Sequence, residues 1–227
     1  MREFSSMYKE KITFTSSIVF TWYFAFAILL SCAKEKTMEE EENIVQTPVA
    51  GPIAAGCEGT EYDDWEKSPY VLPFPVGKSY EVNLSHCSGS YHGLGQPDQF
   101  AIDFAMTIGT KITASRAGKV MYVRESGEDG NHPNNLVIIG HGDDTYAQYM
   151  HLTQNGALVS VGDEVEQGDI IGLSGNTGLS GYPHLHFVVT KYSFRYPYES
   201  IPTTFKNTAA NERSLKSYTT YEAFPYD

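Results

Sequence analysis

The sequence predicts an all-β domain, either a sandwich or a barrel, from three observations. Apolar segments after about residue 63 are short and regularly spaced. Turn-forming residues separate them, as at Gly162-Asp163 and Gln167-Gly168-Asp169. No stretch between 63 and 205 repeats its apolar residues with a helical period. Short strands punctuated by Gly and Asp are typical of sandwiches and barrels.

The expected strands follow one another along the chain, each with its own signal. Segments 100–106 and 145–151 alternate apolar and other residues, which is the pattern of a half-buried strand. Segment 119–123 follows a turn at Ala117-Gly118, and the apolar run 136–139 follows a loop rich in Gly, Asn and Asp. The remaining expected strands, also bounded by turns, are 159–165, 170–173 and 185–190.

The N-terminal segment predicts export. A lead containing Arg2, Lys9 and Lys11 precedes an uncharged run over 12–33, which is long enough to span a bilayer as an uncleaved anchor. The run closes on Leu29-Leu30-Ser31-Cys32, which resembles the lipobox of bacterial lipoproteins. That resemblance implies a signal peptide over 1–31 and a lipidated Cys32. We therefore expect a membrane-anchored lipoprotein of the bacterial cell envelope, facing the periplasm or the exterior.

Beyond the signal, composition divides the chain into a tether, a domain and a tail. Residues 32–62 carry charge runs and the helix breakers Pro48, Gly51 and Pro52, which predict an extended acidic tether. Residues 63–206 hold the expected strands. Residues 207–227 are rich in Ser, Thr and Asn, and we expect them to be peripheral.

The net charge limits the possible binding partners, and the cysteine content bears on whether a disulfide forms. The formal net charge is −12 and Lys and Arg do not cluster, so nucleic acid is excluded as a partner. Cys57 and Cys87 remain after the signal. An even pair in an oxidising compartment favours a disulfide, the alternative being two reduced thiols.

His184 and His186 are the first sign of a functional site. They lie two apart in an apolar run, and residues i and i+2 of a strand point to the same face. Two imidazoles side by side suit a metal site, in which one binds the ion and the other handles a proton. The alternative for this pair alone is two surface or hydrogen-bonded histidines.

Four blocks of sequence follow one another in a specific order and spacing. The blocks are Phe100–Met106 with Ala114–Val120, Asn135–Gly142 leading to His151-Leu152, the turns at 161–165, 168–172 and 174–178, and His184–Phe187. Together they resemble a known family, the lysostaphin-like zinc metallopeptidases with the duplicated hybrid motif fold, which are peptidoglycan endopeptidases of bacteria. The likeness runs from about Tyr80 to Phe205.

The resemblance implies an antiparallel β-sheet core with a groove, one Zn²⁺ and hydrolysis of peptide bonds in peptidoglycan. By position, Asp103 and His186 are metal ligands, and His151 and His184 are the two non-ligand histidines near the reacting water. Zinc sites favour carboxylate and imidazole ligands, and histidine titrates near neutral pH, so these residue types suit both roles. Alternatively, Asp103 is a hydrogen-bonded structural carboxylate and His151 packs against Tyr149.

The third ligand departs from the family pattern. Many relatives carry a histidine four residues before the aspartate, where this chain has Gln99. In 91–98, glycine and proline residues supply a turn that would bring His92 back to Asp103. We therefore predict His92 as the third ligand, ahead of His86, Gln99 and Asp98. His132 and His141 receive no role.

The sequence thus predicts a membrane-tethered zinc metalloendopeptidase that cuts peptidoglycan stems or cross-links. A catalytically inactive member of the same fold, which binds the cell wall or regulates another wall hydrolase, is the alternative. A third hypothesis comes from a related sheet in sugar phosphotransfer proteins, where paired histidines handle phosphate. The predicted export signal argues against it, because that chemistry is cytoplasmic.

Overall fold

The computed structural model describes residues 55–227, which lie within the compact unit Thr47–Asp227. The predicted signal, Cys32 and most of the predicted tether lie outside these residues. In the described part of the chain, no helix has the length and apolar character needed to cross a membrane.

The described residues form an almost purely β structure, as predicted. The only helix within 55–227 is the 3₁₀ turn η1 (Trp65–Lys67). The strands are β1 (Ser79–Leu84), β2 (Ile102–Ala105), β3 (Lys111–Thr113), β4 (Gly118–Arg124), β5 (Leu136–Gly140), β6 (Thr145–Met150), β7 (Leu152–Ala157), β8 (Glu164–Val165), β9 (Ile170–Ser174), β10 (His184–Lys191), β11 (Glu199–Ser200) and β12 (Thr219–Glu222).

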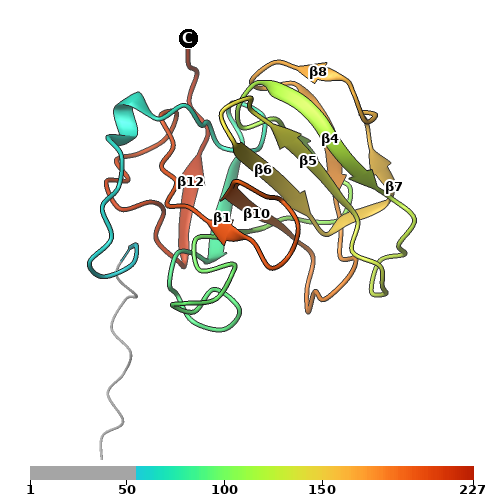
Figure 1. Cartoon of the computed structure of the whole chain (residues 1–227), viewed down its shortest axis with the longest axis horizontal. Helices are drawn as coiled ribbons and strands as arrows, with labels where there is room; N and C mark the ends of the chain where they lie inside the picture. Colours follow the sequence, from blue (N-terminus) through green and yellow to red (C-terminus); the bar gives the residue numbers. More distant parts are fainter. Residues whose placement is uncertain (1–54) are drawn as a thin grey trace, which may run out of the picture. The chain divides into compact units, whose positions relative to one another are not determined.

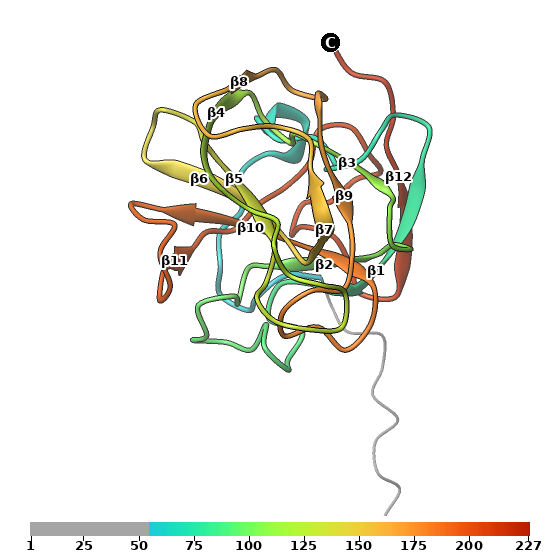
Figure 2. The same ribbon diagram turned by 90° about the vertical axis from the view of Figure 1, so that its right-hand side faces the viewer.

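Two antiparallel sheets build the domain. The larger has the order β12-β1-β2-β10-β6-β5-β4-β8, with β11 added beside β10 (Figure 1). The smaller has the order β3-β9-β7 (Figure 2). β10 runs between β2 and β6, and its residues 184–190 are all buried. A histidine on this strand is therefore held by neighbours on both sides.

An apolar core holds the strands together. Its largest fully buried side chains include Phe74, Phe104, Tyr149, Phe187 and Phe205, which come from distant parts of the chain. Each side chain of this kind contributes roughly 1.5–3 kcal/mol when it leaves water. The core therefore fixes β2, β6 and β10 relative to one another, and these strands lead into the site described below.

The C-terminal segment 207–227 corrects a prediction, because it is part of the domain rather than peripheral. Leu215 and Ala223 are fully buried, and β12 pairs with β1. The Asn207 side chain accepts a hydrogen bond from the Leu72 N–H at 2.7 Å. Polar composition suggested exposure, but here the buried polar side chains satisfy backbone groups that would otherwise lack partners.

The N-terminal end of the described chain is also fixed to the domain. Cys57 and Cys87 form a disulfide with their Cα atoms 5.2 Å apart, which agrees with the favoured pairing. Cys57 is fully buried, and its N–H donates to the Tyr62 hydroxyl at 3.1 Å. Residues 57–62 are therefore not an extended tether, which corrects the predicted extent of that segment.

Candidate metal centre

The pairing of β2 with β10 places Asp103 opposite His186. Both side chains are buried, at 4% and 6% exposure. Nδ1 of His186 donates to Oδ1 of Asp103 at 2.9 Å. A carboxylate in the middle of an apolar sheet needs such a partner, since burying it alone is costly. The two residues predicted as metal ligands are therefore in direct contact.

His92 reaches the same carboxylate from the loop between β1 and β2. Its backbone N–H donates to Gly89 O at 3.0 Å, and Gly89 and Gly95 adopt positive φ angles of 90° and 80° that this tight loop requires. The buried ring places Nε2 3.4 Å from Oδ1 of Asp103. One donor atom each from His92, Asp103 and His186 lie within 4.8 Å of one another.

The other candidates for the third ligand have different partners. The rings of His86 and Phe100 meet edge to face, and both His86 ring nitrogens face hydroxyl groups. The Gln99 side-chain oxygen accepts a hydrogen bond from Gly95 N at 2.7 Å. Asp98 approaches the far nitrogen of His186. Of the four residues considered, only His92 joins the cluster with Asp103 and His186.

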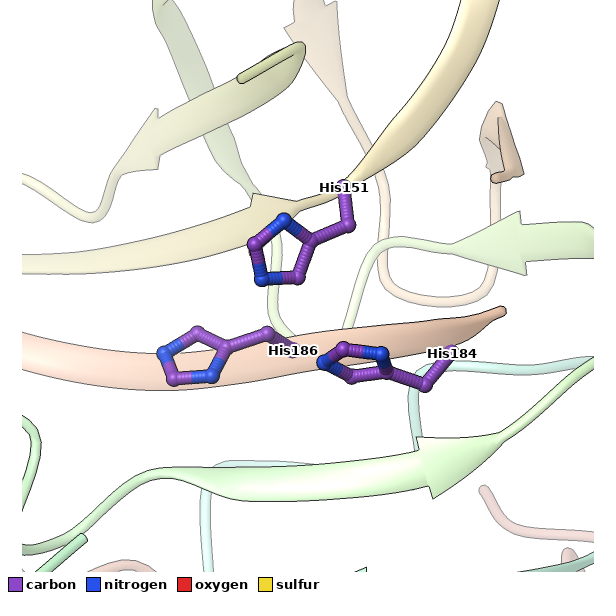
Figure 3. A group of neighbouring side chains, drawn as sticks. All are labelled: His151, His184 and His186. Carbon is purple, nitrogen blue, oxygen red and sulfur yellow. The ribbon is translucent and has the colours of Figure 1, made fainter. Parts of the chain in front are cut away.

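His151 and His184 lie beside this cluster and form a second group with His186 (Figure 3). Their ring centroids are 4.7 Å apart. β6 ends at Met150, one residue before the predicted end, and His151 takes a φ of 65° that turns the chain into β7. The Asn134 side chain holds this turn by accepting from His151 N at 2.9 Å.

Hydrogen bonds to the backbone fix the tautomer of both neighbouring histidines. Nδ1 of His151 lies 2.7 Å from the Thr177 carbonyl, and Nδ1 of His184 lies 2.8 Å from the Tyr182 carbonyl. A carbonyl only accepts, so each Nδ1 carries the proton and each Nε2 keeps its lone pair. Nε2 of His184 lies 3.7 Å from Oδ1 of Asp103. Two nitrogens with free lone pairs therefore flank the cluster.

Burial and charge set the protonation of the site. Burial, with His186 and His184 as neighbours, lowers the pKa of His151 to about 3, and burial also lowers the pKa of His184. Burial alone would lower the pKa of His186, but Asp103 and Asp98 raise it to about 10. Burial alone would raise the pKa of Asp103, but His186 and His92 hold it far below its usual range. These shifts place the buried His186–Asp103 ion pair beside the two neutral imidazoles of His151 and His184.

The residues fit a zinc ion. Two imidazoles and a carboxylate are common zinc ligands, and two ligands of one ion at about 2 Å each lie at most about 4 Å apart. Oδ1 of Asp103 meets this limit with His186 Nδ1 at 2.9 Å and with His92 Nε2 at 3.4 Å. The donor set and these two separations therefore suit a zinc ion, which His92, Asp103 and His186 would hold.

Comparison with known proteins identifies the family. The model of Peptidase family M23 matches residues 98–197. The chain belongs to peptidase family M23. The match includes Asp103, His151, His184 and His186 but begins after His92. Zinc is the cofactor of these peptidases, in agreement with the donor set found here.

Several relatives of this M23 chain have named activities. Peptidoglycan DD-endopeptidase ShyA of Vibrio cholerae is 45% identical over 87 residues, which cover 37% of this chain and 18% of ShyA. Lysostaphin of Staphylococcus simulans is 36% identical over 148 residues, or 65% of this chain and 26% of lysostaphin. The solved catalytic domain of lysostaphin is 32% identical, with 58% of this chain and 84% of that domain covered and a TM-score of 0.37.

The relatives are longer proteins than the region they share with this chain. The matched region spans 31% of the first curated relative, an uncharacterized metalloprotease of Buchnera aphidicola, and smaller shares of ShyA and lysostaphin. The likeness to curated proteins therefore concerns one domain.

One participant in the site was not predicted from the sequence. Tyr198 donates its hydroxyl to Asp98, which in turn faces His186. No spacing or motif marks this tyrosine, because the contact joins residues one hundred positions apart.

Proposed function

We propose that the protein is a zinc-dependent endopeptidase that hydrolyses peptide bonds in the stems or cross-links of peptidoglycan. The observation that carries the proposal is one buried cluster of His92, Asp103 and His186 with two neutral histidines beside it. In this proposal His92 and His186 bind the metal through Nε2 and Nδ1, and Asp103 binds through its carboxylate. When bound, zinc supplies Lewis acidity, which activates water and polarises a carbonyl group.

His151 and His184 perform the proton transfers in this proposal. Their Nδ1–H groups are held by carbonyls, so Nε2 of each is free to accept a proton from the attacking water. The protonated ring then donates to the departing amine or to the oxyanion. The stacked contact between Tyr182 and His184, with centroids 4.6 Å apart, keeps the His184 ring in one orientation.

Peptidoglycan is the proposed substrate because relatives of this domain are named for acting on it. ShyA is named a peptidoglycan DD-endopeptidase, and it shares 45% identity over the matched residues. The complete cluster argues against the inactive wall-binding alternative, which predicts that a ligand or a proton-transfer histidine is missing. The export signal predicted over 1–31 and the lipobox-like Cys32 support action in the bacterial envelope from a membrane anchor.

Zinc content and cleavage of purified muropeptides by the full chain test the proposal. The wild type is expected to contain one zinc per chain and to release shorter peptides, and His186→Ala is expected to do neither. Equal, stoichiometric zinc in both proteins would contradict the ligand assignment. Stoichiometric zinc in a wild type that leaves muropeptides intact would favour the inactive alternative. A Cys32→Ser chain that is still processed and still partitions into membranes like wild type would contradict the lipid anchor.

A further inference from the structure

The two ring nitrogens of His186 face different partners. Nδ1 points at Asp103 and the ligand cluster. Nε2 is buried without a hydrogen bond, and it lies 3.5 Å from Oδ1 of Asp98. Figure 3 shows one nitrogen of this ring pointing away from His151 and His184. An imidazole that binds a metal through Nδ1 carries its proton on Nε2, so the ring needs an acceptor on the Asp98 side.

Asp98 is held in place to serve as that acceptor. The Tyr198 hydroxyl donates to Oδ1 of Asp98, the same oxygen that faces His186. The Asp98 carbonyl accepts from Ala101 N at 2.9 Å, which fixes the turn that leads into β2. The Asp98 side chain is 21% exposed, so water only partly screens its charge.

Tyr198 is in turn fixed to the strand that carries His186. It directly precedes β11, which pairs with β10 through Ser200 and Thr190. Its ring packs on the small cluster of Ala101, Met150 and Val188. Tyr198 therefore connects β10 to the loop that carries Asp98. A shift of that loop would move the carboxylate away from the ring it faces.

From this geometry we propose that Asp98, oriented by Tyr198, is a positioning residue of the zinc site: it accepts the Nε2–H of His186 and so holds Nδ1 toward the metal. The proposal rests on the zinc assignment of the previous subsection. A carboxylate behind a metal-binding histidine orients the ring and makes it a stronger ligand, and its loss typically weakens metal binding by about 10–100-fold. Asp98 lies five residues before Asp103, so one turn supplies both a ligand and the support of another ligand.

Zinc affinity of full-chain variants, measured by competition with a chelator, tests the proposal. Asp98→Ala is expected to bind zinc about 10–100-fold more weakly than wild type and to release it faster. Asp98→Asn keeps an acceptor without the charge, and its zinc affinity is expected to lie between those of wild type and Asp98→Ala. Tyr198→Phe is expected to weaken binding several-fold and to have no added effect in the Asp98→Ala protein. Matched controls are Tyr196→Phe, an exposed neighbour, and Glu199→Gln, an exposed carboxylate on β11; both are expected to bind like wild type.

The melting temperature of each metal-free variant separates positioning from folding. A purely structural role would lower that temperature in Asp98→Ala and leave zinc affinity within twofold of wild type, which would overturn the proposal. If Asp98→Ala does not fold, wild-type affinity in Tyr198→Phe would overturn it as well. If His186→Ala also binds zinc normally, the ligand assignment itself is wrong, so the two failures are distinguishable.

Discussion

His86 and His92 are both 1% exposed and lie six residues apart on one segment, but their surroundings differ completely. Nδ1 of His86 lies 3.1 Å from the Tyr62 hydroxyl and its Nε2 lies 3.4 Å from the Ser214 hydroxyl. His92 offers Nε2 to a carboxylate and has no hydrogen-bond partner for Nδ1. Burial and residue type therefore do not mark a metal ligand, whereas the charge and spacing of its partners do.

The loop between β1 and β2 therefore has a structural half around His86 and a metal-binding half around His92. His86 connects Tyr62, near the disulfide, with Ser214 in the C-terminal segment. Its ring also stacks on Tyr62, with centroids 5.7 Å apart. His92 contacts β2 and β10 through Asp103 and His186. Changes in the first half should alter stability, and changes in the second should alter zinc binding and turnover.

The largest expected effect separates the two histidines by zinc affinity. His92→Ala removes one of three proposed ligands. The variant should therefore lose more zinc affinity than the roughly 10–100-fold lost when a residue that only supports a ligand is removed. His86→Ala and Gln99→Ala should retain the wild-type affinity, because their side chains face other groups. Chelator competition on all three proteins measures this. Unchanged zinc affinity in His92→Ala would contradict its role as a ligand and favour the alternative of an inactive, wall-binding domain.

A second effect separates ligands from proton-transfer residues. His151→Ala and His184→Ala should lower the rate of muropeptide cleavage about 10²–10⁴-fold while zinc content stays near one per chain. His141→Ala is the matched control, because its ring donates to the Ala117 carbonyl outside the cluster. Near-normal turnover in both variants would rule out these roles.

Removal of the disulfide should affect stability rather than metal binding. The Cys57–Cys87 bridge closes a loop with a sequence separation of 30. In the chain-entropy model such a loop is worth roughly 3–4 kcal/mol. Urea denaturation of the Cys57→Ala, Cys87→Ala double variant should show this loss, with zinc affinity close to that of wild type. A large loss of zinc affinity in a folded double variant would show that the structural half also controls metal binding.

The smallest effect is a pH dependence that belongs to the structural half. Burial, with a smaller contribution from His92, lowers the pKa of His86 to about 3. The ordinary value of about 6.5 applies in the unfolded chain, so between these two values the unfolded chain binds one more proton than the folded chain. Stability should then fall by up to about 1.4 kcal/mol per pH unit as the pH drops below 6.5.

His86→Phe removes this titration and tests its origin. The variant should be less stable than wild type at pH 7, because the hydroxyls of Tyr62 and Ser214 lose a partner. Urea denaturation gives the free energy of unfolding at each pH. Between pH 6.5 and 4, this free energy should fall less steeply with decreasing pH in the variant than in wild type, by the equivalent of about one bound proton. If the free energy of unfolding falls equally steeply in both proteins, His86 is excluded as the source of the pH dependence.

The sequence predicted the strands that carry the site better than the segments that support it. Asp103 and His186 lie in apolar strands whose period fixes the face they occupy, so their contact followed from strand pairing. The turn-forming residues after His92 were enough to predict its return to Asp103. The segment 207–227 was misassigned because composition reports polarity, whereas Asn207 is buried by a contact with Leu72, far away in the sequence. Tyr198 acts through one distant contact and leaves no pattern.

The position of the metal is the most direct test of the proposed zinc site, because the histidines form two overlapping groups. Anomalous diffraction at the zinc edge from crystals of the zinc-loaded protein locates the ion without any change of sequence. We expect a single peak within bonding distance of His92 Nε2, Asp103 and His186 Nδ1, with His151 and His184 outside the coordination sphere. A peak bound by His151, His184 and His186, or a site that leaves out His92, would contradict the ligand assignment.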